Sequence, residues 1–141
     1  MDRILKFLDD IFNLRTVKMP QPSKVDHVVM ESYAFGAKGR VFNLGELGGV
    51  IKYHFHKEYA VEIPQILIQW HKMWVAGAGN ASKLQVIKAL RENYGIDVKN
   101  DNIADAVSMA LFYKAYLDGN VTDLYKRKLL EKFEKSLGEI K

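Results

Sequence analysis

Three acidic side chains have the chemical type and the positions expected of ligands for a divalent metal ion. Glu31 follows the apolar residues 28–30, and Asp101 and Asp105 lie four residues apart at the start of an expected helix. A spacing of four puts two carboxylates on the same face of a helix. Such oxygen ligands suit Mg²⁺ or Mn²⁺, and two of these ions about 4 Å apart activate water in phosphodiester cleavage. We therefore expect an oxygen-rich metal site built from these acids.

Two of the three acids also have an ordinary structural explanation. Glu31 at the end of a strand simply reaches water, and acids such as Asp101 are favoured at helix N-termini by capping and by the helix dipole. Asp105 is harder to explain in this way because the small residues Ala104 and Ala106 flank it. A carboxylate in such surroundings is partly desolvated, which is costly unless a cation or hydrogen bonds compensate.

Two loops carry side chains that suit DNA. In the loop after Glu31, two cations are expected to contact phosphates and two aromatic rings to stack on unpaired bases or to wedge a junction; they are Lys38, Arg40, Tyr33 and Phe35. Core packing is the alternative for the rings. The stretch "GAGNASK" at 77–83 offers backbone amides, Asn80, a helix N-terminus and Lys83 as a phosphate cradle. A simple turn is the alternative for this second loop.

The four histidines have no spacing typical of a metal site, and we expect surface or core roles for them. His54 and His56 are two residues apart, so they diverge on a helix, while His27 and His71 stand alone.

The elements that must position these residues are predicted from hydrophobic periodicity and from turn residues. Ser82 and Gln85 form an expected capping box, Gly95 is a natural helix stop, and Pro64 ends the second strand. The pattern predicts helices over 2–14, 41–56, 82–94, 102–117 and 121–140, and strands over 28–31 and 60–63. This order of helices and strands is typical of an α/β fold.

Composition excludes several classes of function. The chain has 141 residues, which is enough for a hydrophobic core, and it contains no cysteine, so disulfides and thiol catalysis are excluded. The formal net charge is +4 and the sequence pI is about 9.2, a mild preference for polyanions. No apolar run approaches the ~20 residues that a membrane span needs, so we expect no membrane partner.

Four motifs occur in a particular order along residues 1–117: "ESYAFGAKG", "LGELGGV", "GNASK" and "NDNIADA". In this order they resemble the RuvC-type Holliday junction resolvases, and the phage branch of that family most closely. The resemblance implies an RNase H-like α/β fold and Mg²⁺-dependent cleavage of branched DNA such as four-way junctions. It also implies a homodimer in the cytoplasm of a bacterial or phage-infected cell.

The resemblance extends to individual acids. Glu31 matches the second acid of the family, at the end of a central strand, and Asp105 matches the last acid of the C-terminal helix. Asp101 matches the acid before it in the phage pattern, whereas some relatives place that acid where this chain has Asn102. Either Asp101 or Asn102 is therefore the further metal ligand.

The sequence also departs from the family pattern. Ala78 occupies a loop position where relatives usually carry lysine, and no first strand with an Asp-x-Ser or Asp-x-Gly motif is present. Because Asp2, Asp9 and Asp10 lie on an expected helix, they do not replace the first catalytic acid. We therefore expect an N-terminally incomplete nuclease domain over 1–117, completed by a missing N-terminal segment or a second chain, and an extra helix over 118–141.

Two other functions remain open from the sequence. One is a DNA-junction-binding remnant or partner subunit without catalysis, in which lysines bind phosphates. The other is a protein-interaction module that uses the helix over 121–140 as its partner surface.

Overall fold

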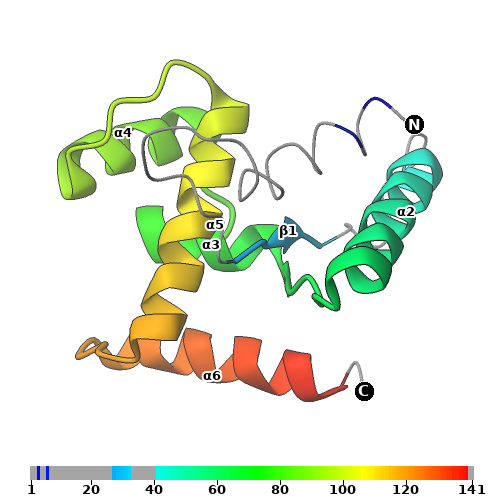
Figure 1. Cartoon of the computed structure of the whole chain (residues 1–141). Helices are drawn as coiled ribbons and strands as arrows, with labels where there is room; N and C mark the ends of the chain where they lie inside the picture. Colours follow the sequence, from blue (N-terminus) through cyan, green and yellow to red (C-terminus); the bar gives the residue numbers. More distant parts are fainter. Residues whose placement is uncertain (1–2, 4–5, 7–26, 33–40, 140–141) are drawn as a thin grey trace, which may run out of the picture. The chain divides into compact units, whose positions relative to one another are not determined.

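The computed structural model describes residues 3, 6, 27–32 and 41–139, which form two compact units (Figure 1). The smaller unit contains helix α2 (Val41–Tyr59) and the residues that follow it to Ile63. The larger unit contains all the other described elements: β1 (Met30–Glu31), β2 (Gln65–Ile66), α3 (Ile68–Ala76), α4 (Lys83–Tyr94), α5 (Asp101–Asp118) and α6 (Leu124–Glu139). In the part of the chain described, no helix is long and apolar enough to cross a membrane.

The described residues are mainly helical, so the expectation of an RNase H-like α/β fold is wrong. Within these ranges the sheet has two strands of two residues each, paired in parallel with Glu31 opposite Ile66. Backbone hydrogen bonds extend the pairing on both sides, from Met30 to Pro64 (3.0 Å) and from Ser32 to Ile66 (2.8 Å). A sheet this small cannot be the layer that helices cover on both faces of an α/β protein. The larger unit is a helical assembly with one short parallel ladder.

The predicted strand over 60–63 is also wrong, because α2 continues to Tyr59 and is closed by a capping turn. Ala60 adopts a left-handed conformation (φ 53°) and its N–H donates to the carbonyl of His56, while the N–H of Val61 donates to that of Phe55. The bond from Ala60 to His56 is the one that defines the αL motif at helix C-termini. The strand β2 begins only after Pro64, and α3 follows it after a single residue. Sequence periodicity missed α3 because a short apolar run does not distinguish a buried strand from a buried helix.

Other helix predictions are confirmed with small changes at the ends. The capping box of α4 is present, since the Gln85 N–H donates to Ser82 Oγ (3.3 Å) and the Ser82 N–H to Gln85 Oε1 (2.7 Å). Gly95 ends α4 in a left-handed conformation (φ 66°), and the Asn100 side chain caps the start of α5. The predicted helix over 2–14 lies outside the described residues.

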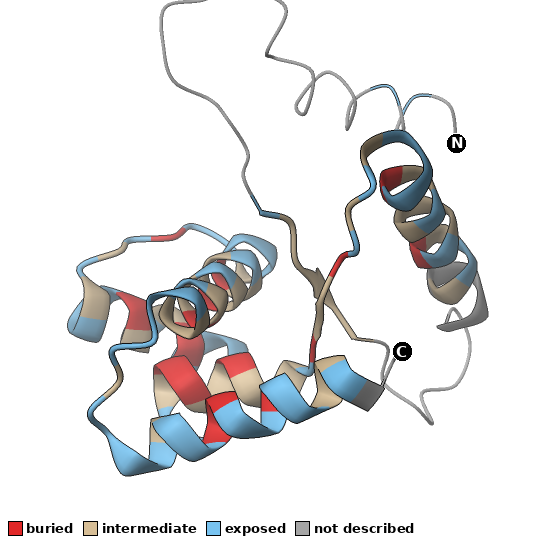
Figure 2. Ribbon diagram, turned by 60° about the horizontal axis from the view of Figure 1, so that its bottom comes forward, coloured by how far each residue is buried: buried red, intermediate tan, exposed pale blue. Residues whose placement is uncertain are grey.

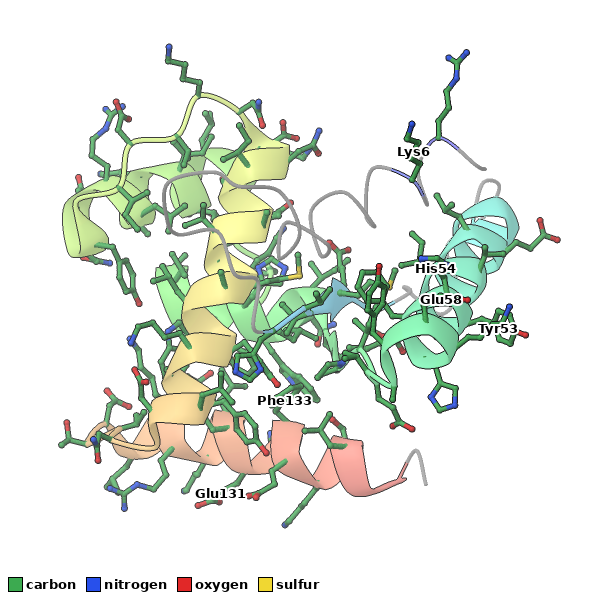
Figure 3. The ribbon with its side chains drawn as sticks, viewed as in Figure 1. Lys6, Tyr53, His54, Glu58, Glu131 and Phe133 are labelled. Atoms are coloured by element: carbon green, nitrogen blue, oxygen red, sulfur yellow. The ribbon has the colours of Figure 1, made fainter. Side chains whose placement is uncertain are left out.

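The core of the larger unit lies between α3, α4, α5 and α6, where buried positions gather on the sides of the helices that face one another (Figure 2). Phe133 of α6 is fully buried, and its ring centroid lies 5.3 Å from that of Phe112 and 5.0 Å from that of Tyr116. Trp70 of α3 packs edge-on against Phe133 at 6.0 Å. Figure 3 shows Phe133 and the exposed Glu131 on opposite sides of α6. The aromatic cluster therefore fixes α6 and α5 to α3.

Replacing Phe133 with alanine is expected to lower the free energy of unfolding by about 3–5 kcal/mol, because the change leaves a cavity inside this cluster. Urea denaturation followed by circular dichroism measures the loss. Glu131→Ala on the exposed side of the same helix is the control and should change stability by no more than about 0.5 kcal/mol. A loss below about 1 kcal/mol for Phe133→Ala would show that the cluster does not hold α6 in place.

Candidate functional site

Glu31 is held by the parallel ladder at the point where β1 ends. The hydrogen bonds on either side of the ladder fix the backbone before and after this residue, and its side chain is partly buried. Only Leu67 separates β2 from α3, so the ladder brings Glu31 next to the start of that helix. The strand-end position predicted for Glu31 is therefore confirmed, although the strand is much shorter than expected.

Asp105 lies close enough to Glu31 for the two carboxylates to repel each other. Burial raises the pKa of the Glu31 carboxyl above its ordinary value, the negative charge of Asp105 raises it further, and the positive charge of Lys72 lowers it. Asp105 itself is partly buried on α5, which packs against α3. The structure thus brings together two of the three acids that the sequence singled out, from distant parts of the chain.

Asp101 is engaged elsewhere. Its carboxylate forms an ion pair with the ammonium group of Lys83, and the hydrogen bond from that lysine lowers the pKa of Asp101. Asn102, the alternative ligand, is exposed in the first turn of α5. The ion pair joins the N-termini of α4 and α5, so Asp101 orients Lys83 in this arrangement.

The loop over 77–82 packs closely against α3. A Cβ atom added to Gly79 would lie 3.2 Å from Met73 Cε and 3.3 Å from both Cβ and the carbonyl oxygen of Gln69. Lys72 Nζ donates a hydrogen bond to the carbonyl of Ala81 at 3.1 Å. Asn80 is exposed, whereas the amides of Ser82 and Gln85 are already used by the capping box. These two amides are therefore not free to bind a ligand.

His71 has a core position, one of the two roles that the sequence analysis expects for the histidines. Its side chain is fully buried on α3, and neither ring nitrogen has a hydrogen-bond partner. Burial lowers the pKa of the imidazole, the charge of Asp105 raises it, and the charge of Lys72 lowers it. The available signal was a lone polar ring inside the apolar run "ILIQWHKMWV".

The remaining predicted DNA contacts, Tyr33, Phe35, Lys38 and Arg40, lie outside the described residues. Within the described ranges, no three histidine, aspartate or glutamate side chains are already gathered into a group that could hold a metal ion. The expected site is therefore represented here by the pair Glu31 and Asp105, with Lys72 and His71 beside it.

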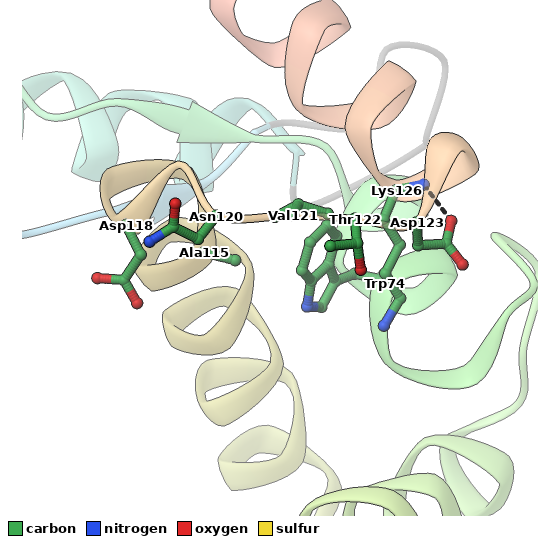
Figure 4. A pocket seen from close by; sticks show the side chains of 8 residues that line it. All are labelled: Trp74, Ala115, Asp118, Asn120, Val121, Thr122, Asp123 and Lys126. Carbon is green, nitrogen blue, oxygen red and sulfur yellow. Dashed lines mark hydrogen bonds between the residues drawn. The ribbon is translucent and has the colours of Figure 1, made fainter.

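A hollow in the surface lies at the C-terminal end of α5, away from Asp105 in the first turns of that helix (Figure 4). It is lined by Trp74, Lys126 and residues of the turn between α5 and α6, and the ammonium group of Lys126 lies 4.8 Å from the centre of the Trp74 ring. The two acids here already have structural roles, since Asp118 pairs with Lys114 and Asp123 accepts a hydrogen bond from the N–H of Lys126 (2.9 Å). Asp118 is separated from Asp105 by about 20 Å of helix, so this hollow is distinct from the acid pair.

Comparisons of the chain with protein families, with characterised proteins and with solved structures found no match. The resemblance to the resolvases consequently rests on the sequence motifs alone, and the function must be argued from the geometry of the acid pair.

The raised pKa of Glu31 predicts a pH-dependent effect on stability in metal-free buffer. An acid whose pKa is raised by folding binds its proton more tightly in the folded state, so ionising it as the pH rises lowers the free energy of unfolding. Glu31→Gln removes that ionisation and should make the protein more stable than the parent at pH 7. The difference should shrink as the pH falls below the ordinary pKa of a glutamate.

Urea unfolding between pH 4 and pH 8 in the presence of EDTA measures this dependence. Glu134→Gln, at an exposed position on α6, is the matched control and should not alter the pH profile. A Glu31→Gln variant that is less stable than the parent at pH 7 would contradict the repulsion between Glu31 and Asp105.

Proposed function

We propose that this protein is a divalent-metal-dependent endonuclease that acts on branched DNA. The observation that carries the proposal is the repulsion between two partly buried carboxylates, Glu31 and Asp105, which lie on β1 and α5. Bringing like charges together away from water is unfavourable unless a cation joins them. The order of motifs that resembles the RuvC-type resolvases gives the same function independently of this geometry.

The donor set fits a hard divalent cation. Mg²⁺ is commonly held by one or two carboxylates together with phosphate oxygens of the substrate, so two acids suffice as the protein's contribution in the described chain. When bound, such a cation lowers the pKa of water and stabilises the leaving oxygen of a phosphodiester. The protein's own role is to hold the two carboxylates in fixed positions and to orient the DNA.

Two lysines near the acids suit the phosphates of the DNA. Lys72 lies beside Glu31 and is fixed by its hydrogen bond to Ala81, and Lys83 is exposed at the start of α4, where Asp101 orients it. We propose that Asp101 acts through Lys83 and that Glu31 and Asp105 bind the metal. Asn102 is then not a ligand.

A second candidate is DNA-junction binding without cleavage. The observation that favours it is that, in the described part of the chain, the acids and histidines do not form a ready-made group of three. In this case the lysines would still give salt-dependent affinity for branched DNA. A homodimer, as in the family that the motifs resemble, is compatible with either function.

Cleavage of a synthetic four-way junction in Mg²⁺ or Mn²⁺ tests the proposal. We expect the parent to cut the junction, and we expect Glu31→Gln and Asp105→Asn to lose cleavage while binding the junction as well as the parent. Asp101→Asn should keep its metal affinity within about threefold, because this residue orients Lys83 rather than binding metal. Glu134→Gln is the control for a distant acid.

Lys83→Gln should weaken binding to all duplex arms and lower the slope of log affinity against log salt by about 0.9, as for one lost phosphate contact. If the parent binds the junction but does not cut it with either metal, the endonuclease is rejected and junction binding without cleavage is the function that remains. Cutting by both Glu31→Gln and Asp105→Asn at the parental rate would show that the site lies elsewhere.

A further inference from the structure

The side of α6 that points away from the core carries a row of lysines. Lys128, Lys132 and Lys135 follow one another at spacings of four and three residues, which places them on one side of the helix. All three are exposed, whereas Phe133 of the same helix is fully buried. Glu131 is the acid among them, and Figure 3 shows it on the side away from Phe133. The three lysines form a surface that we call the lysine face.

The lysine face differs from the neighbouring helices because its cations have no acidic partners. Every cation of α4 and α5 forms an ion pair, and these pairs are Lys83–Asp101, Lys88–Glu92, Arg91–Asp97 and Lys114–Asp118. Among the described residues, no ion pair involves the lysine face. Glu131 lies three residues from Lys128 and four from Lys135, spacings that often give ion pairs, and it pairs with neither. The charge of this face is therefore left to attract an anion from outside.

The order of charges along α6 is the reverse of the one that stabilises a helix. The helix dipole favours acids in the first turn and cations in the last. Helix α6 has no acid in its first turn and no cation in its last. Its first five residues instead include Lys126, Arg127 and Lys128, although Asp123 caps the helix start through the N–H of Lys126. A charge pattern that works against local stability indicates a binding role.

The backbone of DNA fits the lysine face in charge and in length. Helix α6 has five basic and three acidic side chains, so it supplies +2 of the formal net charge of +4. The lysine face spans about 10 Å along the helix, over which one DNA strand carries about three phosphates. A membrane surface does not fit, because the apolar side that would enter it is buried in the core through Leu129, Leu130 and Phe133.

The lysine face lies away from the acid of α5 that the proposed function uses. Figure 1 shows α6 at the C-terminal end of α5, and Phe133 packs there against Tyr116 with ring centroids 5.0 Å apart. Asp105 lies in the first turns of α5, eleven residues or about 16 Å before Tyr116. DNA bound at the lysine face would therefore be held at a distance from the bond that is cut.

We propose that the lysine face binds the sugar-phosphate backbone of a duplex arm of the branched DNA. The inference deepens the proposed function and rests on it for the kind of DNA that is bound. The contact is electrostatic and independent of base sequence, so it adds affinity and holds the arm without taking part in cleavage.

The experiment measures binding of the full chain to a synthetic four-way junction in EDTA, by fluorescence anisotropy between 50 and 200 mM NaCl. Lys128→Gln/Lys135→Gln should lower the slope of log affinity against log salt by about 1.8 and weaken binding at least about fivefold at 100 mM NaCl. Lys57→Gln/Lys114→Gln is the matched control, because it removes the same charge from exposed lysines that already have acidic partners. It should change the slope by less than about 0.9. An equal loss in both variants would show an effect of net charge alone and would overturn the inference.

Site-specific cross-linking locates the contact directly. The chain contains no cysteine, so Lys132→Cys accepts a single thiol-reactive photo-cross-linker. We expect this variant to cross-link to a duplex arm of the junction, and Lys114→Cys, at an exposed position of α5, to give no cross-link. Cross-linking from Lys114→Cys but not from Lys132→Cys would contradict the assignment.

The results separate this inference from the proposed function. If Lys128→Gln/Lys135→Gln loses affinity but the parent never cuts in Mg²⁺ or Mn²⁺, the lysine face is retained and the endonuclease is rejected. If the parent cuts and this variant binds with unchanged affinity and slope, the endonuclease is retained and the lysine face is rejected. Circular dichroism checks that the variant is folded. A change in its sedimentation without DNA would instead identify the face as a contact between copies of the chain and would overturn the inference.

Discussion

The larger unit depends on the packing of α3, a nine-residue helix that contacts α4, α5 and α6 and begins one residue after β2. Trp74 on its buried face packs against Phe112 of α5. Trp70 of the same helix packs against Phe133 of α6. The parallel ladder pairs β1 with β2, which directly precedes α3, so Glu31 lies beside the start of α3. Without this helix neither the aromatic cluster nor the acid pair would form. The position of Glu31 and the packing of α5, which carries Asp105, thus depend on contacts with one short helix.

The sequence predicted the local features of the chain better than its architecture. Ser82, Gln85 and Gly95 mark helix ends through hydrogen bonds or a left-handed conformation that are local in sequence, and these helix signals are confirmed. The prediction of the architecture is wrong around Pro64 and α3, where the chain is apolar without clear periodicity. There the outcome depends on tertiary packing, because buried strands and buried helices have similar composition. The capping turn at Ala60 was also invisible, since alanine is not typical of a left-handed position.

The candidate site was predicted in part. Glu31 and Asp105 are recognisable in the sequence because a carboxylate among small or apolar neighbours is unfavourable. The structure places the two close enough to repel each other. Asp101 is predicted from its spacing to Asp105 and from the resemblance to the resolvases, and its partner Lys83 follows a loop whose path the sequence does not specify. His71 was not selected because one polar residue in an apolar run has no spacing to recognise. The absence of hydrogen-bond partners at its ring nitrogens is a property of the folded chain that the sequence does not show.

The central claim is that Glu31 and Asp105 face one cation-binding position. The most direct test is the pKa of the Glu31 side chain, followed by the carboxyl ¹³C chemical shift in nuclear magnetic resonance. The account predicts that this pKa falls when Mg²⁺ is added and also falls in Asp105→Asn without metal, because each change removes or offsets the repulsion. A Glu31 pKa that is the same with Mg²⁺, without Mg²⁺ and in Asp105→Asn would contradict it.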